Sequence, residues 1–201
     1  WAMDWLEQRG VVAAYFGGHT GLGATRQYRE GQLLNPAMWV FPVTPFGLYA
    51  TFEEFQDYKV PQTDVKAWYR ALVDFSIAQN TSRMVYAHPP GAALWSTVLL
   101  DFLNYAKAQS PRLSWYTTAR LAQFMARRLD VSWSQSRDEA TGQTVFTVSH
   151  PSSLAEMTWR LPRSRYPQAP QLRSGSAEVD GSDSRYWQVR AKGGTQLVFG
   201  V

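Results

Sequence analysis

The sequence predicts an α/β fold: an incomplete, (β/α) barrel-like portion with parallel strands over residues 1–130, followed by an antiparallel β accessory domain over residues 131–201. Two observations support this prediction. Before Asp130, short apolar runs alternate with segments that carry apolar residues on one helical face, which is typical of parallel strands buried by helices. After Asp130, apolar and polar residues alternate, as from Ala155 to Leu161, which is typical of strands with one solvated face.

The first part contains strands and helices in turn. A helix over 1–9 is predicted to end at Gly10, and short apolar runs predict strands at 11–16, 38–41, 83–87 and 113–116. Asp64 is the expected N-cap of a helix, and Thr117 or Thr118 of another, with Leu121, Phe124 and Met125 inward. The two longest helices are expected to bury the stripes Val65, Trp68, Tyr69, Leu72 and Val73, and Trp95, Val98, Leu99, Phe102, Leu103 and Ala106.

The second part is predicted to be all β. Period-two patterns or short apolar runs predict strands at 144–149, 155–161, 177–179, 186–192 and 195–201. Gly193-Gly194 separates the last two and predicts a two-residue β-hairpin turn. The segment Pro162 to Gly175 has no period and is predicted to be a loop.

Composition excludes several classes of function. No segment approaches the roughly 20 apolar residues that a membrane-spanning helix needs, and the absence of cysteine excludes thiolate metal sites, cysteine nucleophiles and disulfides. The net charge is +4, with the basic excess in the second half, but the arginines are scattered and nucleic-acid binding is not expected. Because the chain begins at Trp1 inside a predicted helix, we expect it to be a piece of a longer protein, without its targeting signal.

Two histidines follow predicted strands. His19 comes after strand 11–16 in G-G-H-T-G, and His88 directly follows strand 83–87 in Y-A-H-P-P-G. Side chains at the carboxyl ends of parallel strands line active sites, so both could face one cleft. Each could instead satisfy only a local backbone hydrogen bond. His150, before Pro151, is expected in a surface turn.

Other candidate groups are less specific. Glu53, Glu54 and Asp57 predict a solvated acidic face. Aromatic rings near the predicted strand ends could stack on sugars or could belong to the core; those considered for substrate binding are Trp39, Phe46, Tyr49 and Tyr86. No G-x-S-x-G motif is present, and the glycine-rich segment after Phe16 lacks the Lys-Ser/Thr of a phosphate loop.

Four segments together resemble NodB-type polysaccharide deacetylases. The string R-M-V-Y-A-H-P-P-G, then an amphipathic helix and L-S-W-Y-T-T-A-R-L-A-Q-F, is similar to the last motif of that family. R-G-V-V-A-A-Y-F-G-G is similar to the helix and strand leading to its metal pocket, and W-V-F-P-V-T-P-F-G-L to its third motif. The resemblance covers about residues 1–128.

The resemblance implies that this chain is the C-terminal portion of a metal-dependent enzyme that deacetylates a polysaccharide in the periplasm or outside the cell. It implies a divalent metal, with zinc favoured, His19 as a metal ligand and His88 as the general acid. The chain departs from the family pattern at three places: it lacks the Asp pair that supplies the base, Gly23 stands where a second metal-binding His is expected, and the third-motif Arg is absent. Metal binding is therefore expected to need the full-length protein.

Two alternatives remain at this stage. The chain could be a non-catalytic glycan-binding or scaffold portion of an exopolysaccharide protein, or an α/β enzyme of another kind that shares only the histidines after its strands. Under both the deacetylase and the glycan-binding hypotheses, the expected partner is a polysaccharide. Neither nucleic-acid binding nor a membrane span is expected. The oligomeric state is not predicted.

Overall fold

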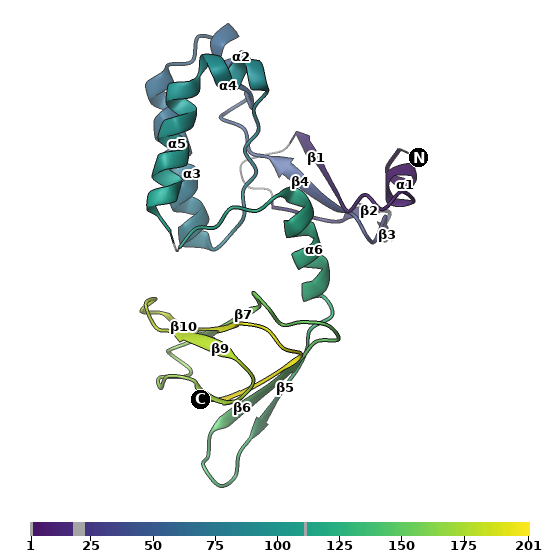
Figure 1. The fold of residues 1–201 in the computed structure, drawn as a ribbon, viewed down its shortest axis with the longest axis vertical. Helices are drawn as coiled ribbons and strands as arrows, with labels where there is room; N and C mark the ends of the chain where they lie inside the picture. The colour runs from purple at the N-terminus through teal and green to yellow at the C-terminus, as the bar shows by residue number, and fades with distance from the viewer. Residues whose placement is uncertain (1, 18–22, 111) are drawn as a thin grey trace. The chain divides into compact units, whose positions relative to one another are not determined.

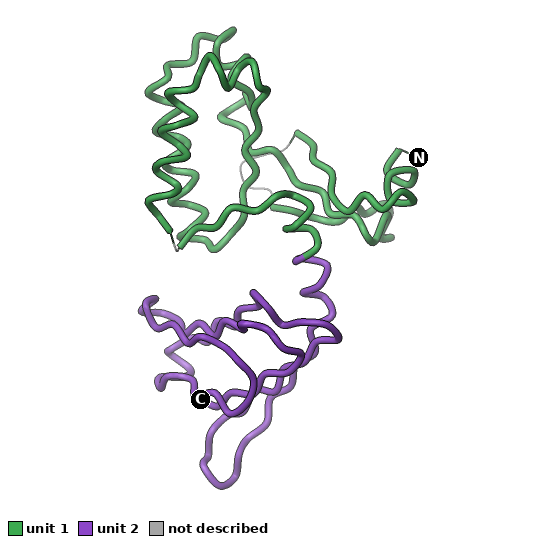
Figure 2. The backbone as a smooth tube through the Cα atoms, in the orientation of Figure 1, with its two compact units in different colours: residues 1–123 green, residues 124–201 purple. Residues whose placement is uncertain are grey.

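The computed structural model describes residues 2–17, 23–110 and 112–201 (Figure 1). The chain forms two compact units, Trp1–Gln123 and Phe124–Val201 (Figure 2). The division falls inside helix α6 (Thr118–Arg128), close to the boundary predicted at residue 130.

The first unit is mixed α/β. Its other elements, in chain order, are α1 (Ala2–Glu7), β1 (Ala13–Gly17), β2 (Gln27–Arg29), β3 (Gln32–Leu34), β4 (Trp39–Val43), α2 (Phe52–Asp57), α3 (Gln62–Gln79), α4 (Pro89–Leu94) and α5 (Ser96–Ala108). β1 and β4 pair in parallel, from Ala13 opposite Trp39 to Gly17 opposite Val43. The described strands form no closed barrel, so the structure confirms a mixed α/β unit with parallel pairing.

The predicted strand 83–87 is reduced to a single parallel bridge between Val43 and Met84. The Thr44 N–H donates to the Met84 carbonyl at 2.8 Å. Two residues earlier on the same edge stands Pro42, which has no N–H to donate. The ladder therefore cannot extend back along β4 toward Ser82. In the other direction, the next donor on this edge, the Phe46 N–H, bonds to the Tyr49 carbonyl at 2.7 Å, so the prediction of a full strand at 83–87 is wrong.

The core of this unit lies between its helices. α3 and α5 pack together and bury most of the two predicted stripes, in a cluster formed by Phe52, Phe55, Val65, Tyr69, Val73, Trp95, Val98, Phe102 and Ala106. The Trp95 ring stacks on Phe52 at a centroid distance of 5.7 Å. Asp64 is not the N-cap of α3, because Pro61 holds that position and the helix begins at Gln62. The two helical stripes are thus confirmed, although the predicted cap was wrong.

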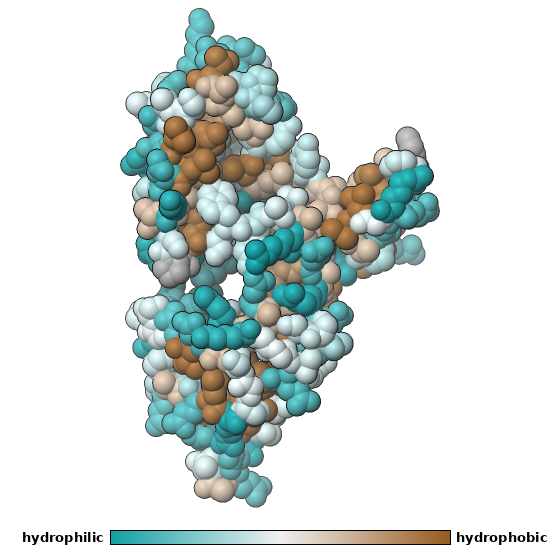
Figure 3. Space-filling model, viewed as in Figure 1, coloured by the Kyte–Doolittle hydropathy of each residue, from teal (hydrophilic) through white to brown (hydrophobic). Residues whose placement is uncertain are grey.

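Some apolar residues of the helices face outward. Hydrophobic side chains gather over part of α3 and α5 in the space-filling view (Figure 3). The large exposed apolar residues of these two helices are Phe75, Leu100 and Leu103. Leu103, which was predicted to be inward, is therefore on the surface. α6 also differs from its predicted pattern: Ala122 is its buried residue, while Leu121, Phe124 and Met125 are only partly buried.

Two other local predictions for this unit were incomplete. Residues 113–116 form no strand, and Trp115 is exposed while its ring meets the edge of Phe102. The antiparallel β2–β3 hairpin was not predicted. Its turn uses Glu30 and Gly31, both at positive φ, and Glu-Gly is not one of the sequence pairs that normally mark such a turn.

The second unit is antiparallel, as predicted. Its strands are β5 (Ser132–Arg137), β6 (Thr144–Ser149), β7 (Thr158–Pro162), β8 (Gln171–Ser174), β9 (Ala177–Asp180), β10 (Tyr186–Ala191) and β11 (Gln196–Gly200). They form two sheets, in the orders β5-β6-β11-β8 and β7-β10-β9. Inward residues of both sheets make one core, formed by Phe146, Val148, Leu154, Leu161, Val189, Ala191, Leu197 and Phe199.

The predicted hairpin at Gly193-Gly194 is wrong. β10 pairs with β7 and β9, whereas β11 pairs with β6 and β8, so the two glycines carry the chain between sheets. Backbone groups of this turn bond elsewhere: Leu154 N–H donates to the Gly194 carbonyl at 2.7 Å, and His150 N–H to that of Thr195 at 2.9 Å. A two-residue hairpin would have paired Lys192 with Thr195, but the Lys192 N–H donates to the Ser176 carbonyl at 2.9 Å and the Thr195 carbonyl is taken by His150.

β5 and β8 were not predicted as strands. Every residue of both is exposed, so neither carries an apolar pattern. The segment Pro162 to Gly175, predicted to be a loop, therefore contains the strand β8, which is recognised only by its pairing with β11. In the described part of the chain, no helix has the length and hydropathy needed to cross a membrane.

Candidate functional site

The candidate site is centred on His88, which the chain places directly before α4. His88 is the N-cap of this helix, with extended backbone (φ −83, ψ 148), and Pro89 and Pro90 occupy the first helical positions. Proline fixes φ and needs no N–H there, so the two prolines define where the helix begins. The imidazole is 48% exposed, and its Nδ1 lies 3.4 Å from Oε2 of Glu53.

Glu53 is held by the first turn of α4. Its Oε1 accepts a hydrogen bond from the Gly91 N–H at 2.9 Å. A Cβ atom on Gly91 would stand 2.6 Å from the Glu53 carboxyl group, so only glycine allows this close approach. Oε2 is buried and accepts no hydrogen bond of standard length among the described residues, which leaves His88 as its ion-pair partner.

The carboxyl group of Glu53 favours its charged form. A hydrogen bond from its own backbone N–H lowers its pKa most, and the Gly91 N–H and His88 lower it further against the opposing effect of burial. A carboxylate beside Nδ1 favours one orientation of the imidazole ring. The arrangement can therefore move a proton through Nε2.

The predicted acidic face is wrong for two of its three members. Glu53 binds Gly91, and Glu54 forms a capping box with Thr51 at the start of α2. Only Asp57 is exposed as expected. Sequence reasoning missed Glu53 because it lies 38 positions before Gly91 and no local pattern connects them.

One tyrosine contacts the imidazole, and a second tyrosine contacts the first. The Tyr86 ring meets His88 edge to face, with centroids 4.9 Å apart, and Tyr15 of β1 lies 5.4 Å from Tyr86. A hydrogen bond between the tyrosine side chains is the largest cause of a raised pKa at Tyr86, followed by burial. Tyr15 is 55% exposed and offers a ring surface that sequence reasoning had not selected.

The structure does not bring the remaining predicted residues into these contacts. Trp39 is buried, with the Arg26 guanidinium 5.2 Å from its ring centroid. Phe46 packs on the buried Phe55 and the partly buried Trp68, and Tyr49 stacks on Tyr58. Substrate binding by these three rings stays a prediction. His19 lies outside the described residues.

His150 has a structural role. It is 5% exposed, so the expectation of a surface turn was wrong. Its Nδ1 accepts hydrogen bonds from the N–H groups of Ser152 and Ser153, both at 2.9 Å, and its Nε2 lies 2.9 Å from the Arg127 carbonyl oxygen. Because Nδ1 is an acceptor, Nε2 carries the proton and donates it. Both nitrogens are occupied.

A metal centre is not formed by the described residues, among which no three His, Asp or Glu side chains gather as a ligand set. His88 and Glu53 together offer two ligands at most. Comparison of the chain with known protein families, curated proteins and solved structures gave no match.

Proposed function

We propose that this chain is part of a metal-dependent polysaccharide deacetylase and supplies the proton donor that acts on acetylated glycan. The observation that carries the proposal is the His88–Glu53 pair, a half-exposed imidazole oriented by an ionised carboxylate. The resemblance of the segment R-M-V-Y-A-H-P-P-G to the last motif of NodB-type enzymes adds support, because it assigns His88 the same role.

The arrangement of the strands also supports the proposal. β1, β4 and the bridge at Met84 follow one another in parallel, and His88 comes four residues after that bridge. We regard this parallel group as a part of a (β/α) barrel-like sheet. In such sheets the groups that react with substrate lie beyond the carboxyl ends of the strands. An enzyme for polysaccharide would act in the periplasm or outside the cell.

In the proposed reaction, water adds to the acetyl carbonyl carbon and the bond from that carbon to the sugar nitrogen or oxygen breaks. The leaving amine or alcohol takes the proton from His88 Nε2, and acetate is released. Glu53 is a positioning residue, because its carboxylate lies beside Nδ1 and orients the imidazole ring. Tyr86 beside the imidazole, and Tyr15 beside Tyr86, supply ring surfaces on which a sugar can stack.

A divalent metal such as zinc, when bound, polarises the carbonyl group and activates water. Three protein ligands are usual for such a catalytic site, and the described residues do not provide them. We therefore assign no step to a metal within this chain. In the proposed enzyme, His19 would be a ligand together with groups from outside these residues, and an Asp from outside them would be the base.

The test is acetate release from an acetylated oligosaccharide by the full-length protein. We expect His88→Ala to lower turnover about 10²-fold or more, as is typical when a general acid is removed. We expect Glu53→Gln to lower turnover and to shift its pH profile, since the partner of the imidazole loses its charge. Asp57→Asn removes an equal charge from the exposed end of the same helix and should change neither.

Unchanged turnover in His88→Ala would contradict the proposal and reduce His88 to the N-cap of α4. Absence of acetate release by the unaltered full-length protein would instead favour glycan binding without catalysis. An equal effect of Glu53→Gln and Asp57→Asn would show that general electrostatics, and not the positioning of His88, explains the loss.

A further inference from the structure

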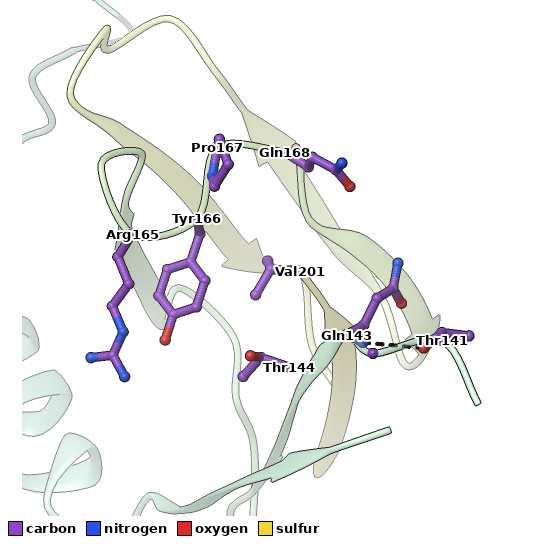
Figure 4. Close-up of a pocket in the computed structure, with 9 residues that line it drawn as sticks. Thr141, Gln143, Thr144, Arg165, Tyr166, Pro167, Gln168 and Val201 are labelled. Atoms are coloured by element: carbon purple, nitrogen blue, oxygen red, sulfur yellow. Dashed lines mark hydrogen bonds between the residues drawn. The ribbon is translucent and has the colours of Figure 1, made fainter. Parts of the chain in front are cut away.

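The second unit contains a cavity of about 400 Å³ that the proposed reaction does not use. Its lining comes from the β5–β6 turn, the loop after β7 and the last residue of the chain: Thr141, Gly142, Gln143, Thr144, Arg165, Tyr166, Pro167, Gln168 and Val201 (Figure 4). This volume is in the range of sites for small ligands. We propose that it binds a carboxylate-bearing sugar residue of a polysaccharide.

The loop that carries Arg165 and Tyr166 is fixed before any ligand arrives. The N–H groups of both residues donate to the Pro162 carbonyl, at 3.0 and 2.8 Å. The Trp187 indole N–H donates to the Tyr166 carbonyl at 3.1 Å, and the Arg163 guanidinium lies 3.8 Å from the Trp187 ring centroid. Little ordering of this wall is therefore needed on binding, which favours affinity.

The lining contains one basic side chain, Arg165, and no acidic side chain. Among the described residues, no carboxylate lies within ion-pair distance of Arg165, whereas Arg173 behind the β5–β6 turn is paired with Asp138 at 2.6 Å. Guanidinium binds carboxylate through two parallel hydrogen bonds. An acidic group on the ligand would complete this pairing.

The rest of the lining is suited to a sugar ring. Tyr166 points into the cavity beside Arg165, with Thr144 and Val201 opposite them (Figure 4). Its ring rests edge to face on Phe146 and has the Arg165 guanidinium 5.4 Å from its centroid. An aromatic ring takes the C–H face of a sugar, and hydroxyl and amide groups pair with its hydroxyls.

The opposite wall offers directed donors. The side-chain oxygen of Gln143 accepts from Arg173 at 2.8 Å, which leaves its amide N–H groups for a ligand. Thr144 on the same wall adds a hydroxyl, and Gln168, on the loop that carries Arg165 and Tyr166, adds a second amide. An acidic peptide could also pair with Arg165. It would not supply the sugar hydroxyl groups that the side chains of Gln143, Gln168 and Thr144 can hydrogen-bond.

The experiment is a titration of the full chain with a short oligogalacturonate, in which binding is measured by calorimetry and by NMR chemical shifts of the backbone amides. We expect the shift changes to centre on the loop 163–168 and the turn 141–144, and Arg165→Gln to weaken binding about tenfold or more, as expected for loss of charged hydrogen bonds. Arg190→Gln removes the same charge at an exposed position of β10 and should keep the affinity. A neutral malto-oligosaccharide of equal length should bind more weakly.

Three results would overturn the proposal. One is the absence of binding by the oligogalacturonate, and another is equal weakening by Arg165→Gln and Arg190→Gln, which would indicate unspecific attraction. The third is equal or tighter binding of a glutamate-rich peptide or of the neutral oligosaccharide. The proposal does not rest on deacetylase activity: binding here is measured without turnover, and a failure of the His88 test would leave it unchanged.

Discussion

Replacing His150 by alanine should destabilise the second unit, because this buried ring connects the end of α6 to the turn after β6. The variant would remove three hydrogen bonds of 2.9 Å: two that Nδ1 accepts from Ser152 and Ser153, and one that Nε2 donates to the Arg127 carbonyl. It would also leave space where a side chain only 5% exposed had packed.

The expected cost follows from these contacts. A hydrogen bond inside a protein contributes about 1 kcal/mol net, and a buried group left without a partner costs about 1–3 kcal/mol. Three bonds therefore give about 3 kcal/mol. We expect the free energy of unfolding of this unit to fall by about that amount, with further loss where the cavity cannot collapse.

The assay is urea unfolding combined with hydrogen exchange of amides in β6 and β11, which report on the second unit. Amides of α5 serve as an internal reference and should not change. Two further variants divide the effect. His150→Asn keeps an acceptor for the Ser152 and Ser153 N–H groups and should recover part of the loss. His150→Gln keeps a donor that can extend toward the Arg127 carbonyl and should recover a different part.

The reasoning would be refuted if His150→Ala cost less than about 1 kcal/mol, the size of one hydrogen bond. It would also be refuted if His150→Asn were no more stable than His150→Ala, because the turn bonds would then have no measurable role.

Three other outcomes are expected. Gly91→Ala should keep the helical content, because Gly91 lies inside α4, yet lower acetate release about tenfold or more, since its Cβ would displace the Glu53 carboxylate; unchanged turnover would contradict this. Burial raises the pKa of Tyr69 to about 12. Stability should therefore be complete below about pH 10, the unfolded pKa, and fall by up to about 3 kcal/mol as pH rises toward 12; Tyr69→Phe should not show this part of the alkaline loss. The isolated 201-residue chain should show no deacetylase activity and bind zinc with a dissociation constant on the order of 10⁻⁵ M or weaker, and a tight stoichiometric site in calorimetry would show that the ligands were misidentified.

Local patterns predicted the elements whose burial follows a period. The stripes from Val65 to Val73 and from Trp95 to Ala106 became the buried faces of α3 and α5. Apolar residues at helical spacing lie on one side of a helix, so they are buried together when that side packs against the core. The apolar runs at 11–16 and 38–41 became the parallel pair β1 and β4. Exposed strands such as β5 could not be predicted, because none of their residues is buried and they therefore lack alternating apolar and polar residues.

The sequence by itself determined most of the buried faces of the two long helices, the antiparallel nature of the second unit and the place of His88 directly before two prolines. Only the tertiary structure decided that Glu53 is the partner of His88, that His150 is buried, and that β10 and β11 belong to different sheets. The reason is the range of the interactions. Periodicity and proline act within a few residues, whereas strand partners and ion pairs are chosen by groups that folding brings together from distant parts of the chain.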